Sequence, residues 1–310
     1  MNIIFFGSDD FALAHLQTLH AAGYSIVACV TQPDRPKGRG MKMVVSPIKQ
    51  FALDHQLPIL QPVAFDETVI SELKAFAPQL FIVIAYGRIL PQLVLDLPSR
   101  GAINVHGSLL PRYRGAAPIN WAILKGDKES GVTVIQMNAK MDAGAILMQE
   151  KVDIDEYETS LSLRQKIRAA GQKLLIETLT QIQNQRIIPT VQDELNVTIA
   201  PKLTKELGRI DWNQSAAEIS RMVRGLLPWP GAYTFLNGKM LKILSGDVLP
   251  DNKDAARPGE VISMTANDFS VQTGSGILKV IRVHLADHKP MDVKDFLLGH
   301  KLEIGELLKK

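Results

Sequence analysis

Residues 80–106 decide the fold class, because they read LFIVIAYGRILPQLVLDLPSRGAINVH and contain two separate apolar runs. The first run, Leu80–Ala85, is apolar at every position, and the second covers Ala102–His106. Strands that are apolar throughout are buried on both faces, which is typical of a parallel sheet covered by helices. Similar runs alternate with segments of helical spacing in both directions, which predicts an α/β fold. The further strands expected are Asn2–Phe6, Ile26–Thr31, Pro58–Leu60, Val132–Met137 and Ala145–Val152, and the helices are Phe11–Ala22, Pro47–His55, Asp66–Phe76 and Ser160–Gln183.

The character of the chain changes after residue 184. Residues 185–207 show little periodicity and contain Pro189 and Pro201, so we expect a linker there. A helix over Ser215–Leu226 follows, and then come short apolar runs, two of them joined by the hairpin signal Asn237-Gly238. Short strands at this spacing predict a small OB-like β-barrel. We therefore expect a Rossmann-like, mostly parallel sheet domain at 1–184 and a barrel domain at 208–310. The barrel strands expected are Ala232–Leu236, Met240–Leu244, Glu260–Met264, Phe269–Thr273 and Ile277–His284.

Composition excludes several classes of protein. The chain has 310 residues, 46% of them hydrophobic, and a net charge of +3, which is far below that of a protein binding nucleic acid by charge alone. Its single cysteine, Cys29, lies in an apolar run, so we expect no disulfide and a buried, unreactive thiol. No apolar run is long enough for a membrane span, and the first residues lack the features of a signal peptide. These observations favour a cytoplasmic protein, and no cluster of His, Cys or Asp has the spacing of metal ligands.

The glycine after the first predicted strand starts the sequence Gly7-Ser-Asp-Asp-Phe11. This is not the Gly-x-Gly-x-x-Gly pattern that binds the pyrophosphate of a dinucleotide. A nicotinamide or flavin site is therefore poorly supported, even on a Rossmann-like sheet.

The most informative stretch is 104–118, which reads NVHGSLLPRYRGAAP. Asn104 and His106 are two positions apart at the end of a predicted strand, so their side chains point to the same face. The carboxyl edge of a parallel sheet is where open α/β folds bind ligands. An amide can donate to a developing oxyanion, and an imidazole can gain or lose a proton near neutral pH.

This segment resembles the signature of the folate-dependent formyltransferases, and the resemblance extends over most of the chain, through Asp211-Trp212 and Pro228-Trp-Pro230. It implies that Asn104, His106 and a distant aspartate act on the formyl carbon. Asp142, in Met141-Asp-Ala-Gly144, takes the aspartate's place in this sequence. Whether Asp142 orients His106, charges it or holds a water molecule stays open.

The resemblance also implies the substrates. The formyl donor would be 10-formyltetrahydrofolate, and the acceptor would be the α-amine of methionyl initiator tRNA, with domain 1–184 catalytic, domain 208–310 binding tRNA and the chain acting as a monomer. The residues implied for folate binding are Ser108, Leu109, Leu110, Pro111, Tyr86 and Gly87.

A basic segment, Gln32–Lys42, is rich in glycine and proline and resembles the family's loop for the tRNA acceptor stem. Such a composition favours an irregular, mobile loop. The residues implied for tRNA binding are Arg35, Lys37, Arg39 and Lys42. Weaker candidates in the barrel domain, for each of which a solvated surface position is the simpler interpretation, are Arg221, Arg224, Lys239, Lys242, Lys279 and Arg282.

Three other functions remain as alternatives. Formyl transfer to an amino-sugar nucleotide would use the same three residues, but it does not need the basic segment. A formyltetrahydrofolate hydrolase would use water as the acceptor and would lack the C-terminal barrel. A non-catalytic RNA-binding module would have no use for Asn104, His106 and Asp142.

Overall fold

The computed structural model describes residues 1–37, 42–250 and 256–308, and the chain forms two compact units. Each unit gathers three stretches of sequence. Unit 1 contains Met1–Gly115, Ser130–Asp153 and Gln165–Ala200, and unit 2 contains Ala116–Glu129, Ile154–Arg164 and Pro201–Lys310. The domain boundaries expected from the sequence stay a prediction.

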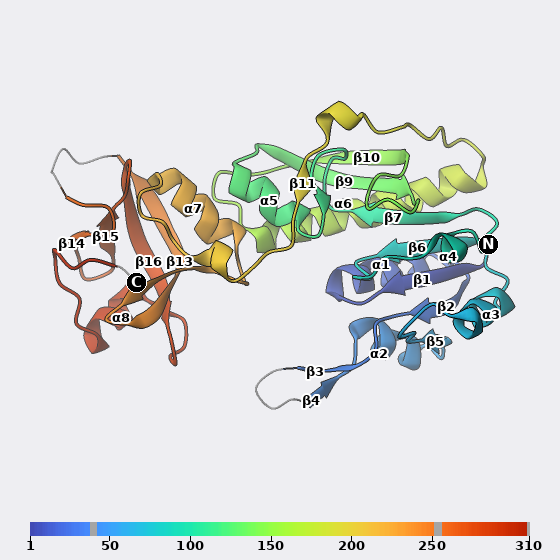
Figure 1. Ribbon diagram of the computed structural model, residues 1–310, viewed down its shortest axis with the longest axis horizontal. Helices are drawn as coiled ribbons and strands as arrows, with labels where there is room; N and C mark the ends of the chain where they lie inside the picture. Colours follow the sequence, from blue (N-terminus) through green and yellow to red (C-terminus); the bar gives the residue numbers. More distant parts are fainter. Residues whose placement is uncertain (38–41, 251–255, 309–310) are drawn as a thin grey trace. The chain divides into compact units, whose positions relative to one another are not determined.

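The larger sheet has seven strands in the order β10-β9-β7-β6-β1-β2-β5 (Figure 1). The strands from β5 to β7 are parallel to their neighbours, whereas β9 is antiparallel to β7. The predicted Rossmann-like, mostly parallel sheet is thus confirmed. Strand order reverses between β1 and β6, and ligands of open α/β sheets bind at such a switch point. The bounds are β1 Ile3–Gly7, β2 Ile26–Val30, β5 Ile59–Leu60, β6 Leu80–Ile84, β7 Ala102–His106, β9 Glu129–Gln136 and β10 Ile146–Asp153.

The helices that accompany this sheet start at side-chain caps. Asp9 accepts from the backbone N–H of Ala12, and the side chains of Ser46 and Asp66 cap the next two helices in the same way. The long helix α6 lies close to α1, because a Cβ added at Gly171 would come within 2.8 Å of His15 Nε2. The helices are α1 Asp10–Ala21, α2 Pro47–Asp54, α3 Glu67–Ala75, α4 Gln92–Leu95 and α6 Ser160–Gln183.

The core of unit 1 comes from the continuous apolar strands. Every residue of β1 and of β6 is buried, as expected for a sheet covered on both faces. One side of the sheet packs around aromatic side chains, with the rings of Phe6 and Phe81 4.9 Å apart and Tyr86 edge-on to Phe6. The carboxyl ends of these strands are therefore rigidly placed.

Unit 2 contains an antiparallel sheet in the order β12-β13-β16-β15-β14, with β17 beside β16. The predicted hairpin at Asn237-Gly238 is confirmed, and both residues have positive φ, at 48° and 75°, as the tightest hairpin turns require. All pairings of this sheet are antiparallel, which is consistent with the OB-like fold expected. The strands are β12 Ala232–Leu236, β13 Lys239–Leu249, β14 Val261–Met264, β15 Phe269–Gln272, β16 Ile277–Leu285 and β17 Met291–Asp292.

The helices of unit 2 pack on this sheet and on one another. Helix α7, Ala216–Gly225, begins with a capping box between Ser215 and Glu218. Helix α5, Pro118–Lys125, lies against α7, and Asn120 Nδ2 donates to Gly225 O at 2.7 Å. Helix α8 covers Val293–Gly299. Neither α5 nor α8 was expected from the sequence.

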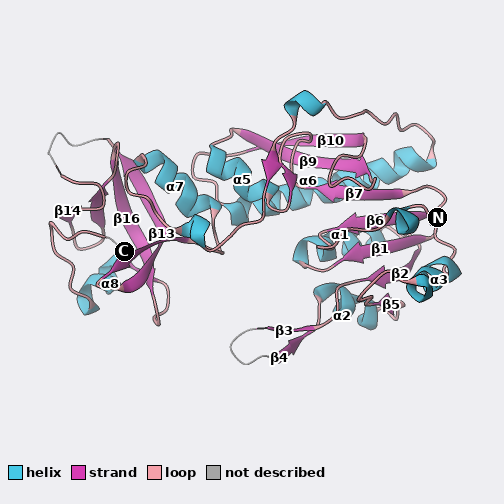
Figure 2. Cartoon of the chain, viewed as in Figure 1, coloured by secondary structure: helices cyan, strands magenta, loops and turns pink. Residues whose placement is uncertain are grey.

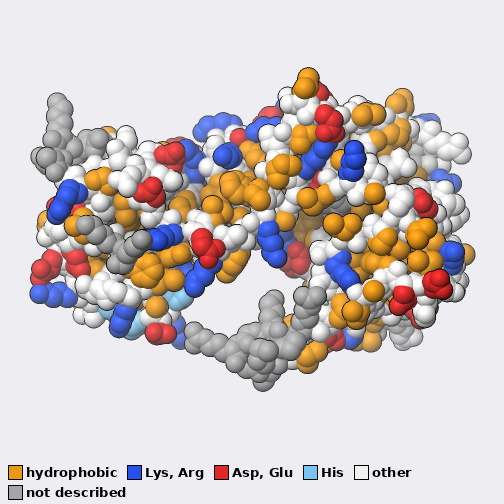
Figure 3. Space-filling model, viewed as in Figure 1, with side chains coloured by type: hydrophobic (Ala, Val, Ile, Leu, Met, Phe, Trp, Pro, Cys, Tyr) orange, Lys and Arg blue, Asp and Glu red, His pale blue; other side chains and the backbone are white. Residues whose placement is uncertain are grey.

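Charged side chains of both signs are interspersed over the face shown in Figure 3, in keeping with the small net charge. Residues 184–198 run almost entirely as irregular chain (Figure 2), apart from a short 3-10 turn at Glu194–Asn196. No helix in the described part of the chain combines the length and apolar character needed to cross a membrane.

Candidate active site

The candidate site begins with two side chains of β7 near the strand-order reversal. Asn104 and His106 are separated by one residue in β7, and they pair across to Val83 of β6 and Thr133 of β9 respectively. His106 is only 6% exposed, whereas Asn104 is half-buried. The strand therefore holds an amide and an imidazole at the carboxyl edge of the sheet, as the sequence predicted.

Asp142 reaches the same place from the turn between β9 and β10. Its backbone has φ 53°, in the left-handed region that aspartate tolerates better than most residues. Gly144 is required two residues later, since a Cβ there would overlap the carbonyl group of Gln136. The backbone of the Asp-Ala-Gly turn therefore passes very close to the end of β9, and the Asp142 side chain points toward β7.

The side chains of Asn104 and His106 both face the same carboxylate oxygen of Asp142. Asp142 Oδ1 lies 3.4 Å from Asn104 Nδ2 and 3.7 Å from His106 Nδ1. The other oxygen, Oδ2, accepts the backbone N–H of Gly115 at 2.8 Å. Asn104 and Asp142 are 38 residues apart in the sequence, and the antiparallel strand β9 brings the chain back beside β7.

Hydrogen bonding fixes the orientation of the imidazole. His106 Nε2 lies 2.9 Å from the carbonyl oxygen of Tyr113, which only accepts, so Nε2 carries a hydrogen. The nitrogen facing Asp142 is therefore Nδ1, which is protonated as well only in the imidazolium form. Asp142 Oδ1 is the acceptor that faces this nitrogen, at 3.7 Å.

The expected folate segment forms a tight loop after β7, held mainly by its backbone. Ser108 Oγ donates to Arg112 O at 2.6 Å. Thr133 Oγ1 donates to Ser108 O at 2.6 Å and accepts from Leu110 N at 3.1 Å. Leu110 is 3% exposed and packs as core, and Leu109 and Pro111 are half-buried. The structure thus brings Ser108–Pro111 next to the site, but the Leu110 side chain points inward.

The other expected folate residues, Tyr86 and Gly87, follow β6. Tyr86 is 2% exposed. Burial raises the pKa of the Tyr86 phenol, although the nearby Arg88 opposes the shift. The Tyr86 carbonyl accepts from Gln32 Nε2 at 2.8 Å, and Gly87 has φ 76° directly beside that amide. Of the two residues, Tyr86 is buried and Gly87 is exposed.

Comparison with known proteins decides which chemistry this arrangement belongs to. A family described as formyl transferase matches residues 1–179, and one described as formyl transferase, C-terminal domain, matches residues 202–301. The chain belongs to the formyl transferase family. It is 42% identical to a methionyl-tRNA formyltransferase of Lachnospira eligens, over 99% of both chains. It is 44% identical to one of Agathobacter rectalis over 98% of both, and 41% identical to one of Caldanaerobacter subterraneus over the whole of both.

Solved structures share the fold of this formyltransferase at lower identity. WlaRD, a sugar 3N-formyl transferase, superposes with a TM-score of 0.68 and 19% identity over 93% of this chain and 99% of its own. An N-formyltransferase of Helicobacter canadensis gives 0.67 and 17% over 90% and 97%. At this identity the likeness shows the fold alone.

The basic segment of this formyltransferase differs from the irregular loop expected. Residues Arg35–Lys37 (β3) and Lys42–Val44 (β4) pair as antiparallel strands. Asp34 accepts from Gln61 Nε2 at 2.9 Å and from Lys49, which lowers the pKa of the Asp34 carboxyl. The backbones of Arg35, Lys37 and Lys42 thus lie in a hairpin, and Arg39 lies outside the described residues.

Several of the weaker cationic candidates in unit 2 already have partners in the protein. Arg224 Nη1 donates to Glu158 O at 2.7 Å, and burial lowers the pKa of its guanidinium. Lys242 Nζ donates to Pro230 O at 2.7 Å. Lys279 and Arg282 lie within ion-pair distance of Asp268 and Asp292, at 3.5 and 3.8 Å. The cationic groups of these four side chains therefore already interact with residues of the protein itself.

The sequence did not reveal the residues that support the site. Gln192, from the predicted linker, donates to the carbonyls of Asp142 and Gly144. Arg114 donates to Gln192, and Thr133 binds the loop after β7. A buried glutamine in an aperiodic segment carries no sequence signal, whereas Arg114 lies within the signature stretch and was passed over as part of it.

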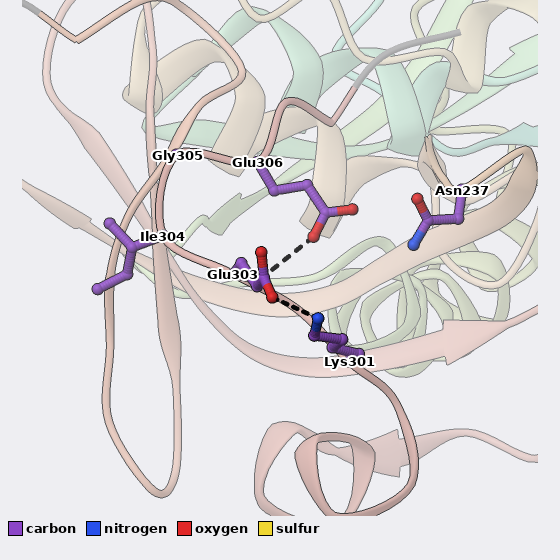
Figure 4. A pocket seen from close by; sticks show the side chains of 6 residues that line it. All are labelled: Asn237, Lys301, Glu303, Ile304, Gly305 and Glu306. Atoms are coloured by element: carbon purple, nitrogen blue, oxygen red, sulfur yellow. Dashed lines mark hydrogen bonds and ion pairs between the residues drawn. The ribbon is translucent and has the colours of Figure 1, made fainter.

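A separate hollow of about 500 Å³ lies in unit 2 (Figure 4). Two of the residues that line it, Lys301 and Glu303, form an ion pair at 2.6 Å. It contains none of the expected site residues and is lined by Asn237, Lys301, Glu303, Ile304, Gly305 and Glu306. Within residues 1–37, 42–250 and 256–308, no three His, Cys, Asp or Glu side chains are placed to hold a metal ion.

Proposed function

We propose that this formyltransferase moves the formyl group of 10-formyltetrahydrofolate to the α-amino group of methionyl initiator tRNA. The observation that carries the proposal is the convergence of Asn104, His106 and Asp142 at the carboxyl edge of the sheet. Full-length likeness to methionyl-tRNA formyltransferases supports the acceptor. Two solved relatives were studied with 5-N-formyl-THF and with folinic acid, which supports the donor.

The chemistry requires more help for oxygen and for the leaving nitrogen than for the nucleophile. An α-amine has a pKa of about 7.7–8.0, so part of it is neutral near pH 7.5. Its nitrogen attacks the formyl carbon and forms a tetrahedral intermediate with a negative oxygen. The bond from carbon to the folate nitrogen then breaks, that nitrogen takes up a proton, and the new amide loses one.

The site residues fit these demands. Among the described residues, Asn104 Nδ2 has only a long contact of 3.4 Å, to Asp142, so it is available to donate to the oxyanion. Removing such a donor costs about 3 kcal/mol in comparable sites. His106 Nδ1 and Asp142 form the pair that moves the proton from the attacking amine to the folate nitrogen, because Nε2 is bound to Tyr113.

Residues around the site supply the two substrate surfaces in this proposal. The donor folate occupies the strand ends beside Tyr86-Gly87 and Ser108–Pro111, which the strand-order reversal supports. Arg35, Lys37, Arg39 and Lys42 contact tRNA phosphates, together with residues 208–310. Because all three reacting side chains belong to unit 1 of one chain, we further propose a monomer. A single, buried cysteine fits the reducing cytoplasm.

The test is formyl transfer to charged initiator tRNA with 10-formyltetrahydrofolate as the donor. Uncharged tRNA and an amino-sugar nucleotide are run in parallel, and Asn104→Ala is compared with Asn267→Ala, an exposed asparagine of unit 2. We expect product from charged tRNA alone and a loss of about 100- to 1000-fold in kcat for Asn104→Ala, with tRNA affinity kept. Formylated sugar without formylated tRNA would refute the acceptor.

A further inference from the structure

Gln192 uses its whole side-chain amide on the turn that carries Asp142. It is 5% exposed, and its Nε2 donates to Asp142 O at 2.7 Å and to Gly144 O at 2.8 Å. Its Oε1 accepts from Arg114 Nε at 3.0 Å. Both N–H groups and the oxygen are therefore engaged within the protein, and each bond has normal length.

We propose that Gln192 is a positioning residue, whose amide holds the Asp142 turn in the conformation needed for formyl transfer; this inference rests on the proposed function. Asp142 lies in the left-handed region, with φ 53°, which is disfavoured without support. The carbonyls of Asp142 and Gly144 belong to the backbone of the turn that carries the carboxylate. By binding both of them, one side chain fixes the place where the carboxylate starts.

The carboxylate itself is only loosely held. It has one short bond, from Gly115 N at 2.8 Å, whereas its distances to Asn104 and His106 are 3.4 and 3.7 Å. Long contacts of this kind do not resist a rotation or shift of the turn. The alignment of Asp142 with His106 therefore depends on the backbone of the turn, and thus on Gln192.

Arg114 keeps the Gln192 amide in a single orientation. The Arg114 guanidinium can only donate, so it bonds to the amide oxygen of Gln192. If the amide were reversed, its NH₂ group would face the N–H of Arg114, and neither could accept. Arg114 is itself held by Glu194, whose carboxylate oxygens lie at 2.9 and 3.2 Å. This ion pair lowers the pKa of Glu194, so the carboxylate stays ionised at neutral pH.

The same connecting segment also supports the residues that bind the imidazole and the carboxylate. Thr198 Oγ1 accepts from Tyr113 N at 2.8 Å, and Tyr113 O binds His106. Ala200 lies directly against Gly115, where an added Cβ would come within 2.5 Å of Ala200 O. Residues 192–200 thus support both the Asp142 turn and the Tyr113–Gly115 segment, and Gln192 acts through its side chain, so it can be changed without altering the backbone.

The test compares Gln192→Met and Gln192→Glu with a matched control, Gln172→Met. Gln172 also donates through Nε2 to two acceptors, Ala14 O and Thr18 Oγ1, but it lies on α6, and both of these partners belong to α1. Methionine keeps the volume and removes both donors. Ionised glutamate keeps the length and the contact to Arg114, but it cannot donate to the two carbonyls and places an oxygen against them.

We expect kcat for formyl transfer to fall about 10- to 100-fold in both Gln192 variants, with KM for donor and acceptor changed by less than about threefold. Gln172→Met should lose similar stability and keep its kcat. A Gln192→Glu protein that folds and keeps wild-type kcat refutes the positioning role, as does a rise in KM without a fall in kcat. Absence of wild-type turnover on charged tRNA would instead refute the proposed function.

Discussion

Thr133→Val is a near-isosteric change that removes the hydroxyl bound to the loop after β7. Thr133 is fully buried, and its Oγ1 donates to Ser108 O, accepts from Leu110 N and accepts from Gln149 Nε2. Valine fills the same volume and suits a strand, so neither a cavity nor a loss of strand propensity contributes. The substitution therefore isolates the hydrogen bonds.

The magnitude follows from the groups left without partners. Ser108 O loses a donor and Leu110 N loses an acceptor, while the Gln149 amide keeps its bond to Leu110 O at 2.8 Å. An orphaned buried group costs about 1–3 kcal/mol, so two cost about 2–6 kcal/mol. We expect about 2–4 kcal/mol, because the loop lies at the sheet edge, where water can reach part of it.

The assay is urea denaturation followed by far-UV circular dichroism, with Thr178→Val as the control. Thr178 is equally buried, but its hydroxyl bonds only to Leu174 O within α6, which the helix already satisfies, so we expect less than about 1 kcal/mol there. The KM for the folate donor should rise about tenfold in Thr133→Val as Ser108–Pro111 shifts, equivalent to about 1.4 kcal/mol. Equal losses of stability in the two variants would refute the reasoning.

Two further experiments, one on the unchanged chain and one on a variant, test local features. Burial raises the pKa of Cys29 to about 12, so its thiolate is scarce at pH 8 and a disulfide reagent should label it only after denaturation; rapid labelling of the native chain would contradict its burial. Gly144→Ala places a Cβ against the Gln136 carbonyl, so it should cost about 1–3 kcal/mol and reduce kcat; a variant with normal urea midpoint and normal turnover would show that the turn adapts freely.

The sequence predicted the elements whose periodicity is simple. Helix Ser160–Gln183 and strands Ala102–His106 and Ala232–Leu236 have the bounds expected, because burial of one stripe or of whole strands leaves a clear pattern. Helix α5 was missed, since its eight residues begin at Pro118 and directly follow a proline- and glycine-rich signature. The β3–β4 hairpin was also missed, because its glycine and proline content indicates irregular chain.

The candidate site was predicted in part. Asn104 and His106 could be placed from strand alternation, whereas Asp142 came only from the family resemblance, because nothing local pairs a turn aspartate with a strand 38 residues earlier. The inward direction of Leu110 and the role of Gln192 depend on tertiary packing. Such contacts leave no periodic trace in the sequence, so physical reasoning from pattern alone does not reach them.

The position of Gln192 along the chain affects the order in which the site can mature during synthesis. A ribosome delivers residues from the N-terminus onward, so β7, β9 and the Asp142 turn emerge before the segment that binds them. A nascent chain ending at residue 184 already carries Asn104, His106 and Asp142 but lacks the amide for the turn and the hydroxyl for Tyr113. If Gln192 positions the Asp142 turn as proposed, a chain that has formed the sheet gains competence for chemistry only when residues 192–200 have joined it.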